Sequence, residues 1–188
     1  MYSLTALVLA AALSVLGSSP RSSPQGKPVR SEPIFTEFKA PPDSLADMIA
    51  EAELVARGRV VGQTSRDRSD AGLTRTTYRV KILDVLRISP DRESADTIEV
   101  VRSGGVRDRG TYVEHSHQVG FPAFDDGREY LLFLVWNKAL NSWVPAYGPD
   151  SAFDLTSGVA DTAGTSKVAL TLKGKKASDV LDIVRRGR

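Results

Sequence analysis

Two histidines separated by one residue are the first candidates for chemistry in this sequence. His115 and His117 are the only histidines of the chain and lie in the stretch Glu114-His115-Ser116-His117. Residues two apart on a strand point to the same side, so both imidazoles could reach one divalent transition-metal ion. A metal site needs a third ligand, and the candidates in the flanking loops are Asp108, Asp125 and Asp126, of which we select Asp125. The alternative is a solvated pair on an exposed loop or edge strand.

A second candidate site is a glycine turn flanked by arginines. Arg102, Arg107 and Arg109 surround Gly104-Gly105. Backbone amides of such a turn, together with guanidinium groups, can hold a phosphate or a sulfate. The sequence contains neither a phosphate-binding loop with Lys-Ser/Thr nor a Gly-x-Gly-x-x-Gly motif. The turn therefore predicts a general ligand-binding site, with turn glycines beside solvated arginines as the alternative.

Aromatic residues cluster around a predicted hairpin turn at 137–141. Trp143 and Tyr147 follow this turn, and Trp136 precedes it. Aromatic rings in such a cluster can form a platform for a sugar or a peptide. They also pack in cores and in cross-strand pairs, which is the more common role. We therefore treat Trp143 and Tyr147 as candidate ligand-binding residues with packing as the alternative.

Nucleophilic catalysis has no support in the sequence. The chain has no cysteine and no Gly-x-Ser-x-Gly elbow, and Ser116 lies between the two histidines, where a hydrogen-bonded triad is hard to form. We assign no catalytic residue and expect a protein that is not an enzyme. The formal net charge of +2 gives no strong attraction to nucleic acid. The basic strand face at Arg75, Arg79 and Lys81 lacks the interleaved aromatic residues that bind single strands.

The elements that must position these residues are mainly strands. Thr74 to Ile82 alternate between apolar or β-branched residues and charged or polar ones, which is typical of a strand with one buried face. The segment 131–136 is apolar on both faces and must be covered on both sides, for example by a barrel interior and a helix. Further strands are predicted at 54–63, 97–103, 111–119, 142–147, 152–156 and 167–172. Helices are predicted from Ser44, with Asp47 in a capping arrangement, and over 178–186.

These elements predict a mainly β protein, a small OB-like barrel, closed or partly open, with a short N-terminal helix and a C-terminal helix. Residues 1–19 have no charged side chain and contain an apolar run followed by small residues, which is typical of a cleaved signal peptide. Residues 20–42 are rich in proline and serine and predict a disordered tether. We assign residues 43–188 to a single domain. After cleavage of residues 1–19, no remaining segment is long and apolar enough to span a membrane.

A pattern of strands and turns resembles a recurrent type of secreted bacterial domain. It comprises a helix and a Gly-x-Val strand at 45–61, then 76–80, 82–86, Gly104-Gly105 and 122–134. The same order resembles netrin-type modules and tissue inhibitors of metalloproteinases, which implies an OB-like barrel. Those inhibitors chelate the protease zinc through an N-terminal cysteine. This sequence has no cysteine, so the resemblance bears on the fold and does not carry that mechanism over.

We therefore expect an exported, non-enzymatic binding or interaction module. The signal peptide predicts secretion, or a periplasmic or cell-envelope location, and the partner is an unknown protein or small molecule outside the cytoplasm. Nucleic acid is not an expected partner, and no cofactor is assigned apart from the metal that His115 and His117 could hold. Two alternatives stay open, a metal-dependent protein using this pair and a purely structural envelope protein.

Overall fold

The computed structural model describes residues 26–67 and 74–187. The predicted signal peptide, 1–19, and the first part of the predicted tether lie outside these residues. Within them the protein is mainly β, as the sequence predicts. Three helices and one 3-10 turn accompany the strands. The elements are β1 (Val29–Ile34), α1 (Leu45–Glu51), β2 (Leu54–Asp67), β3 (Thr74–Ile88), β4 (Thr97–Ser103), β5 (Gly105–Asp108), β6 (Val113–Gln118), β7 (Glu129–Asn137), β8 (Ser142–Pro145), η1 (Gly148–Ser151), β9 (Ala152–Asp154), α2 (Lys167–Leu172) and α3 (Ala177–Arg186).

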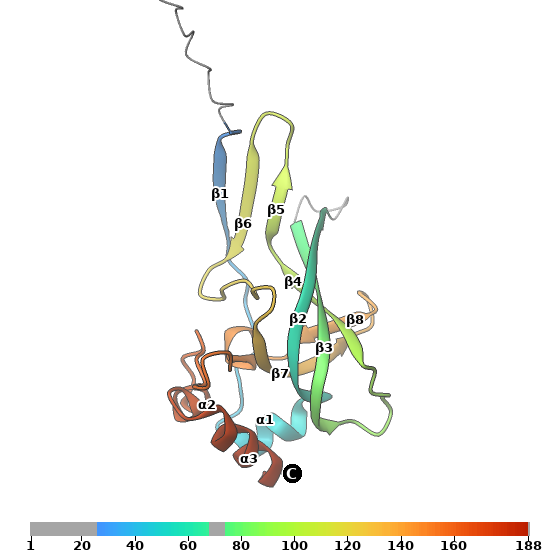
Figure 1. The fold of residues 1–188 in the computed structure, drawn as a ribbon, viewed down its shortest axis with the longest axis vertical. Coiled ribbons are helices and arrows are strands. Elements are labelled where there is room, and N and C mark those ends of the chain that lie inside the picture. The colour runs from blue at the N-terminus through green and yellow to red at the C-terminus, as the bar shows by residue number, and fades with distance from the viewer. Residues whose placement is uncertain (1–25, 68–73, 188) are drawn as a thin grey trace, which may run out of the picture.

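The strands form two sheets. The larger sheet has the order β2-β3-β4-β8-β7-β9, and β2 pairs with β7 as well as with β3. The smaller sheet has the order β1-β6-β5 and projects from the end of the molecule opposite the three helices (Figure 1). The chain passes from one sheet to the other between β4 and β5, at Gly104 and Gly105. The two sheets therefore meet at the glycine turn that the sequence singles out.

Strand β7 is covered on both faces, as its apolar sequence predicts. Leu131 and Phe133 pack in a cluster with residues of α1, α2 and α3. Tyr130, Leu132 and Leu134 pack in a second cluster, with inward residues of β2, β3 and β4. Because successive residues of a strand point to opposite faces, β7 joins the two halves of the core.

Strand β2 is irregular and contains two glycines, Gly58 and Gly62. Its register against β3 shifts at three places, including Arg57/Gly58 and Val60/Gly62. A β-carbon on Gly58 would lie 2.4 Å from a methyl carbon of Val80. Bulges of this kind bend a strand and increase its twist, which lets one strand pair with β3 along its length and with β7 at its start.

The prediction of a strand at 167–172 is wrong. These residues form α2, where the Ser166 side chain caps the helix by accepting from the Ala169 backbone N–H. Val168, Ala169 and Leu172 are buried, whereas Leu170 is 59% exposed. The alternation of apolar residues at 168, 170 and 172 suggested a strand, but the residues that are buried follow helical spacing.

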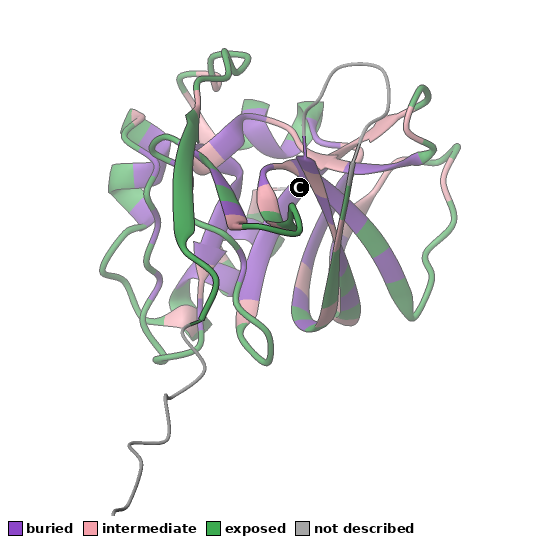
Figure 2. Ribbon diagram, turned by 90° about the horizontal axis from the view of Figure 1, so that it is seen from above, coloured by how far each residue is buried: buried purple, intermediate pink, exposed green. Residues whose placement is uncertain are grey.

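The predicted tether also differs from the structure over part of its length. Val29–Ile34 form β1, which pairs in parallel with β6. The strand is exposed over nearly its whole length and lies at the edge of the small sheet (Figure 2). Its side chains bury little, so the composition gave no sign of a strand, and the backbone pairing with β6 is what orders it.

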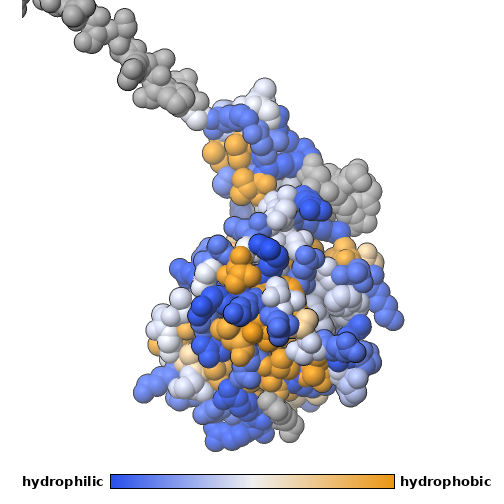
Figure 3. All heavy atoms as spheres, turned by 45° about the vertical axis from the view of Figure 1, so that its right-hand side comes forward, coloured by the Kyte–Doolittle hydropathy of each residue, from blue (hydrophilic) through white to orange (hydrophobic). Residues whose placement is uncertain are grey.

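Apolar side chains are also present on the surface. Hydrophobic patches lie on the body and on the projecting small sheet, separated by hydrophilic side chains (Figure 3). Exposed large apolar residues of the small sheet and its flanks are Val29, Phe35, Val106 and Val119. In the part of the chain described, no helix has the length and apolar character needed to cross a membrane.

Candidate functional site

A cavity of about 630 Å³ lies where the two sheets meet. Its walls come from β2, β3 and β4 of the large sheet, from β5 and β6 of the small sheet, and from the loop at 120–123. This volume is in the range of small-molecule sites, roughly 300–1,000 Å³. The hydrogen-bonding side chains in its walls include Gln63, Ser65, Thr76, Ser103, Ser116 and Gln118.

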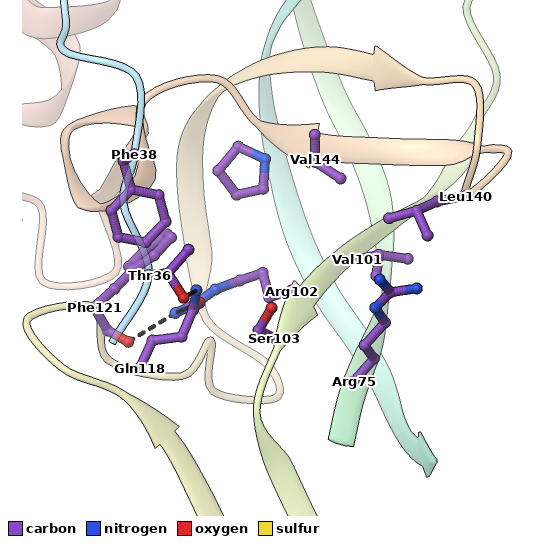
Figure 4. A pocket seen from close by; sticks show the side chains of 11 residues that line it. Thr36, Phe38, Arg75, Val101, Arg102, Ser103, Gln118, Phe121, Leu140 and Val144 are labelled. Atoms are coloured by element: carbon purple, nitrogen blue, oxygen red, sulfur yellow. Dashed lines mark hydrogen bonds between the residues drawn. The ribbon is translucent and has the colours of Figure 1, made fainter. Parts of the chain in front are cut away.

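Arg102 is the one lysine, arginine or acidic residue among the described residues that line this cavity. It continues the inward row of β4 that begins with Ile98 and Val100, and it is only 6% exposed. Its Nη1 donates to the Pro122 carbonyl at 2.5 Å, and its Nη2 donates to the Phe121 carbonyl at 2.7 Å. Nη2 also lies 3.4 Å from the side-chain oxygen of Gln118 (Figure 4). Neutral groups therefore hold the guanidinium in place.

No carboxylate among the described residues pairs with Arg102. The guanidinium carbon lies 3.4 Å from the ring centroid of Phe121 and 4.5 Å from that of Phe124. Its Nε is buried and has no hydrogen-bond partner. Loss of solvent lowers the pKa of Arg102 to about 10, so the side chain keeps its charge at neutral pH. A buried charge without a counter-ion is unfavourable by an amount on the order of several kcal/mol.

Hydroxyl groups fix the opposite wall of the cavity. The Ser65 and Thr76 hydroxyls lie 2.9 Å apart, and Thr76 donates to the Gly104 carbonyl at 2.7 Å. Gly105 has a φ of +146°, and a β-carbon there would lie 2.4 Å from both hydroxyl oxygens. Only glycine leaves room for this contact. The two hydroxyls therefore hold the turn between β4 and β5, and the turn forms part of the cavity wall.

A smaller cavity of about 150 Å³ lies on the other side of Arg102. Thr36 and Phe38, which follow β1, form part of its wall together with Gln118 and Phe121 (Figure 4). Gln118 lies 3.3 Å from the Thr36 hydroxyl, and the rings of Phe38 and Phe121 meet edge to face at 5.9 Å. The segment after β1 therefore supports the residues that hold Arg102.

Glu114 is a second buried charge near the cavity, but it is paired. It is 3% exposed, accepts from Arg109 Nε at 2.7 Å, and accepts from the Ser116 hydroxyl at 3.1 Å. The hydrogen bond from Arg109 holds the pKa of the Glu114 carboxyl below its usual value. Glu114 is therefore neutralised locally and does not offset the charge of Arg102.

The two histidines lie on the exposed side of β6, where the strand alternates with the buried Glu114, Ser116 and Gln118. Both histidines still contribute to the cavity wall. His117 Nδ1 lies 3.3 Å from the hydroxyl of Ser31 on β1. The histidines therefore share one side of the strand, as their spacing predicts.

Asp125, the predicted third metal ligand, lies elsewhere. It is in the wall of a different cavity and forms an ion pair with Arg128 at 3.1 Å. Within residues 26–67 and 74–187, no group of three or more histidine and acidic side chains is placed to hold a metal ion. The structure does not bring Asp125 together with His115 and His117.

Of the three arginines around the glycine turn, the structure buries one. Arg102 is in the cavity wall, whereas the side chain of Arg109 is 31% exposed and is paired with Glu114. Arg107 lies on β5, opposite Glu114 in the pairing of β5 with β6. Neither Arg107 nor Arg109 is in the cavity wall. The predicted site is therefore centred on the guanidinium of Arg102.

Trp143 and Tyr147 are both buried by packing, and Trp143 also lies with Trp136 in the wall of a cavity of about 410 Å³. Trp143 is 6% exposed and meets Trp136 edge to face, with ring centroids 5.3 Å apart. Tyr147 is 2% exposed, and its hydroxyl donates to Glu51 at 2.8 Å. Burial of the Tyr147 hydroxyl raises its pKa, and the hydrogen bond to Glu51 raises it further. Tyr147 thus fixes α1 against the sheet, and its ring is not available as a platform.

Several residues of the site were not identified from the sequence. Gln118, Phe121, Phe124 and Thr76 surround Arg102 or line the cavity, but none belongs to a catalytic or ligand-binding motif. One signal was present in the alternation of Ile98, Val100 and Arg102, which places an arginine on the inward side of β4. The contacts with Phe121 and Gln118 depend on how the loop after β6 folds back, and no local pattern predicts this.

Comparison with known proteins does not assign the chain to a family. No model of a protein family matches it, and no curated protein matches it significantly.

Proposed function

We propose that the protein is an exported binding module that takes a small ligand into the cavity between its two sheets. The observation that carries this proposal is the cavity of about 630 Å³ itself, with an apolar lining, several hydroxyl and amide groups, and one buried charge. A largely apolar cavity with a few polar groups is the usual form of a small-molecule site. Among the residues that the structure describes, no set of side chains is arranged for covalent chemistry, so we propose a binding role.

We further propose that the scaffold is an OB-like barrel. The pairings β2–β3, β3–β4, β4–β8, β8–β7 and β7–β2 run through five strands and return to the first. The contact between β4 and β8 is a single parallel pair, Val100 with Trp143, so this is the weakest part of the ring. This arrangement and the resemblance to secreted netrin-like domains support the proposal. Arg102 then lies at one end of the barrel interior.

Blocking the cavity tests the proposed function. Gln63 is an exposed residue of β2 in the cavity wall, and Thr64 is its exposed neighbour outside it. Neighbouring strand residues point to opposite faces, so Gln63→Trp narrows the cavity and Thr64→Trp is a matched control. The wild-type protein is screened by thermal shift and calorimetry against neutral, cationic and anionic small molecules and zinc, copper and nickel salts.

We expect at least one class of small molecule to bind the wild type and the Thr64→Trp variant, and to bind Gln63→Trp at least tenfold more weakly. If no compound binds at millimolar concentration, the proposed function is wrong. Stoichiometric binding of a metal ion that is lost in His117→Ala would instead favour the metal-binding alternative.

A further inference from the structure

We propose that the cavity binds an organic carboxylate, a monoanion with an apolar body, and that the ligand supplies the counter-charge for Arg102. This inference rests on the proposed binding function and adds the chemical class of the ligand.

The first step is the charge of Arg102. It is the one basic side chain that is buried among the described residues. Arg57, Arg109 and Arg128 are all more exposed, and each has a carboxylate partner within 2.5–2.7 Å. Burial removes the solvation of a charge, so a buried arginine needs a partner more than an exposed one does. Within residues 26–67 and 74–187, the arginine with the greatest need of a counter-ion therefore lacks one.

The second step is the hydrogen-bonding state of the guanidinium. Its Nη groups are held by the carbonyls of Phe121 and Pro122, whereas Nε is buried and has no acceptor. Gln118 is the weakest partner, at 3.4 Å. A carboxylate that displaces the Gln118 side chain can accept hydrogen bonds from Nε and Nη2 of Arg102. These two nitrogens form one edge of the guanidinium, and such an edge matches the two oxygens of a carboxylate.

The third step is the lining around Arg102. The described residues in the wall of this cavity include no aspartate or glutamate, and the nearby Glu114 is paired with Arg109. The Ser103 hydroxyl and the Gln63 side-chain amide offer neutral donors. Tyr78, Phe121 and Ala123 offer apolar surface. A single buried positive charge matches a monoanion better than a doubly charged phosphate, and the apolar surface favours a ligand with a hydrocarbon or aromatic body.

Pairs of isosteric probes test the charge requirement. Benzoate and hexanoate are titrated into the full chain by calorimetry, and benzamide, hexanamide, inorganic phosphate and sulfate are titrated under the same conditions. We expect the carboxylates to bind at least tenfold more tightly than the amides, and phosphate and sulfate to bind more weakly than the carboxylates.

An internal counter-ion tests the role of Arg102 without removing it. Gln118→Glu places a carboxylate of nearly the same shape beside Nη2, where it competes with the ligand. We expect this variant to keep or raise the melting temperature at pH 7 and to lose carboxylate affinity by at least tenfold. Thr64→Glu, which makes the same change in net charge outside the cavity wall, should retain the affinity.

The outcomes separate this inference from the proposed function. If the amides bind as tightly as the carboxylates, or phosphate binds more tightly, the carboxylate inference is wrong while small-ligand binding stands. If carboxylates bind but Gln118→Glu retains wild-type affinity, Arg102 is not the anchor and the inference is also wrong. If Gln118→Glu fails to fold, the wild-type affinities for the carboxylates and the amides still test the carboxylate inference. If no probe and no compound of the wider screen binds, both proposals fail.

Discussion

At the scale of single residues, two buried charges near the cavity have opposite environments. Glu114 accepts two hydrogen bonds and faces a cation, whereas Arg102 contacts carbonyls, an amide and two aromatic rings. Aromatic faces attract a cation but do not neutralise it. Glu114 therefore stabilises the unliganded fold, whereas Arg102 has no anionic partner among the described residues, which is the gap that the proposed carboxylate would fill.

The pairing of Glu114 predicts how stability depends on pH. Because the pKa of Glu114 is held below its ordinary value of 4.5, the unfolded chain binds a proton more readily than the folded one in acid. The stabilisation is present above pH 4.5 and is lost as the pH falls through the folded value. We expect Glu114→Gln to lower the free energy of unfolding by about 1–3 kcal/mol at pH 7, with a smaller difference from wild type below pH 4.

Urea denaturation from pH 7 to pH 3 measures this effect. Arg109→Gln serves as the companion variant, and the two substitutions together should cost less than the sum of their separate effects, because they remove one shared interaction. A difference between wild type and Glu114→Gln that stays constant over this pH range would contradict the prediction.

At the scale of elements, α2 shows that the secondary structure of a short apolar segment depends on the residues against which it packs. Leu170 and Leu172 are two residues apart, and on a strand they would share one face. On α2 they lie about 200° apart, so Leu172 is 1% exposed in the cluster around α1 and α3, while Leu170 is 59% exposed.

This difference gives a direct test of the helix. We expect Leu172→Ala to lower the free energy of unfolding by about 2–4 kcal/mol, because it leaves a cavity in the core. The matched variant Leu170→Ala should change it by less than about 0.5 kcal/mol, because its side chain is largely in solvent. Equal losses for the two variants in urea titrations would instead favour the strand that the sequence predicted.

At the scale of the whole molecule, the cavity lies where the two sheets meet, beside the glycine turn between β4 and β5. The segment after β1 crosses to the body, where Phe38 packs on Phe121 and lies against Gly148. The N-terminal segment thus links the small sheet to the loop that holds Arg102. The cavity depends on contacts between residues that are far apart in the sequence.

Export is the prediction that concerns the whole chain. Residues 1–19 lie outside the described structure, and their role as a signal peptide stays a prediction from the sequence. We expect full-length protein expressed in a bacterium to appear outside the cytoplasm with a mature N-terminus between residues 18 and 20. N-terminal sequencing and cell fractionation measure this. Uncleaved protein retained in the cytoplasmic fraction would count against it.

Much of the fold could be predicted from the sequence because the signals are local. The alternation from Thr74 to Ile82 predicts β3, and the apolar run at 131–136 predicts a strand covered on both faces. The capping arrangement of Ser44 and Asp47 predicts α1. In the structure the Asp47 backbone N–H donates to the Ser44 hydroxyl and caps the first turn. Each of these elements depends on residues within a few positions of one another.

The sequence by itself determined the mainly β class and the absence of disulfides, and it singled out Gly104 and Gly105, which lie in the wall of the cavity. Only the tertiary structure decided that Arg102 is the buried member of the three arginines, and that Val29–Ile34 form a strand. The physical reason is that burial and strand pairing depend on partners distant in the chain. Phe121 and Gln118 surround Arg102, and β6 orders β1, through contacts that no local pattern specifies.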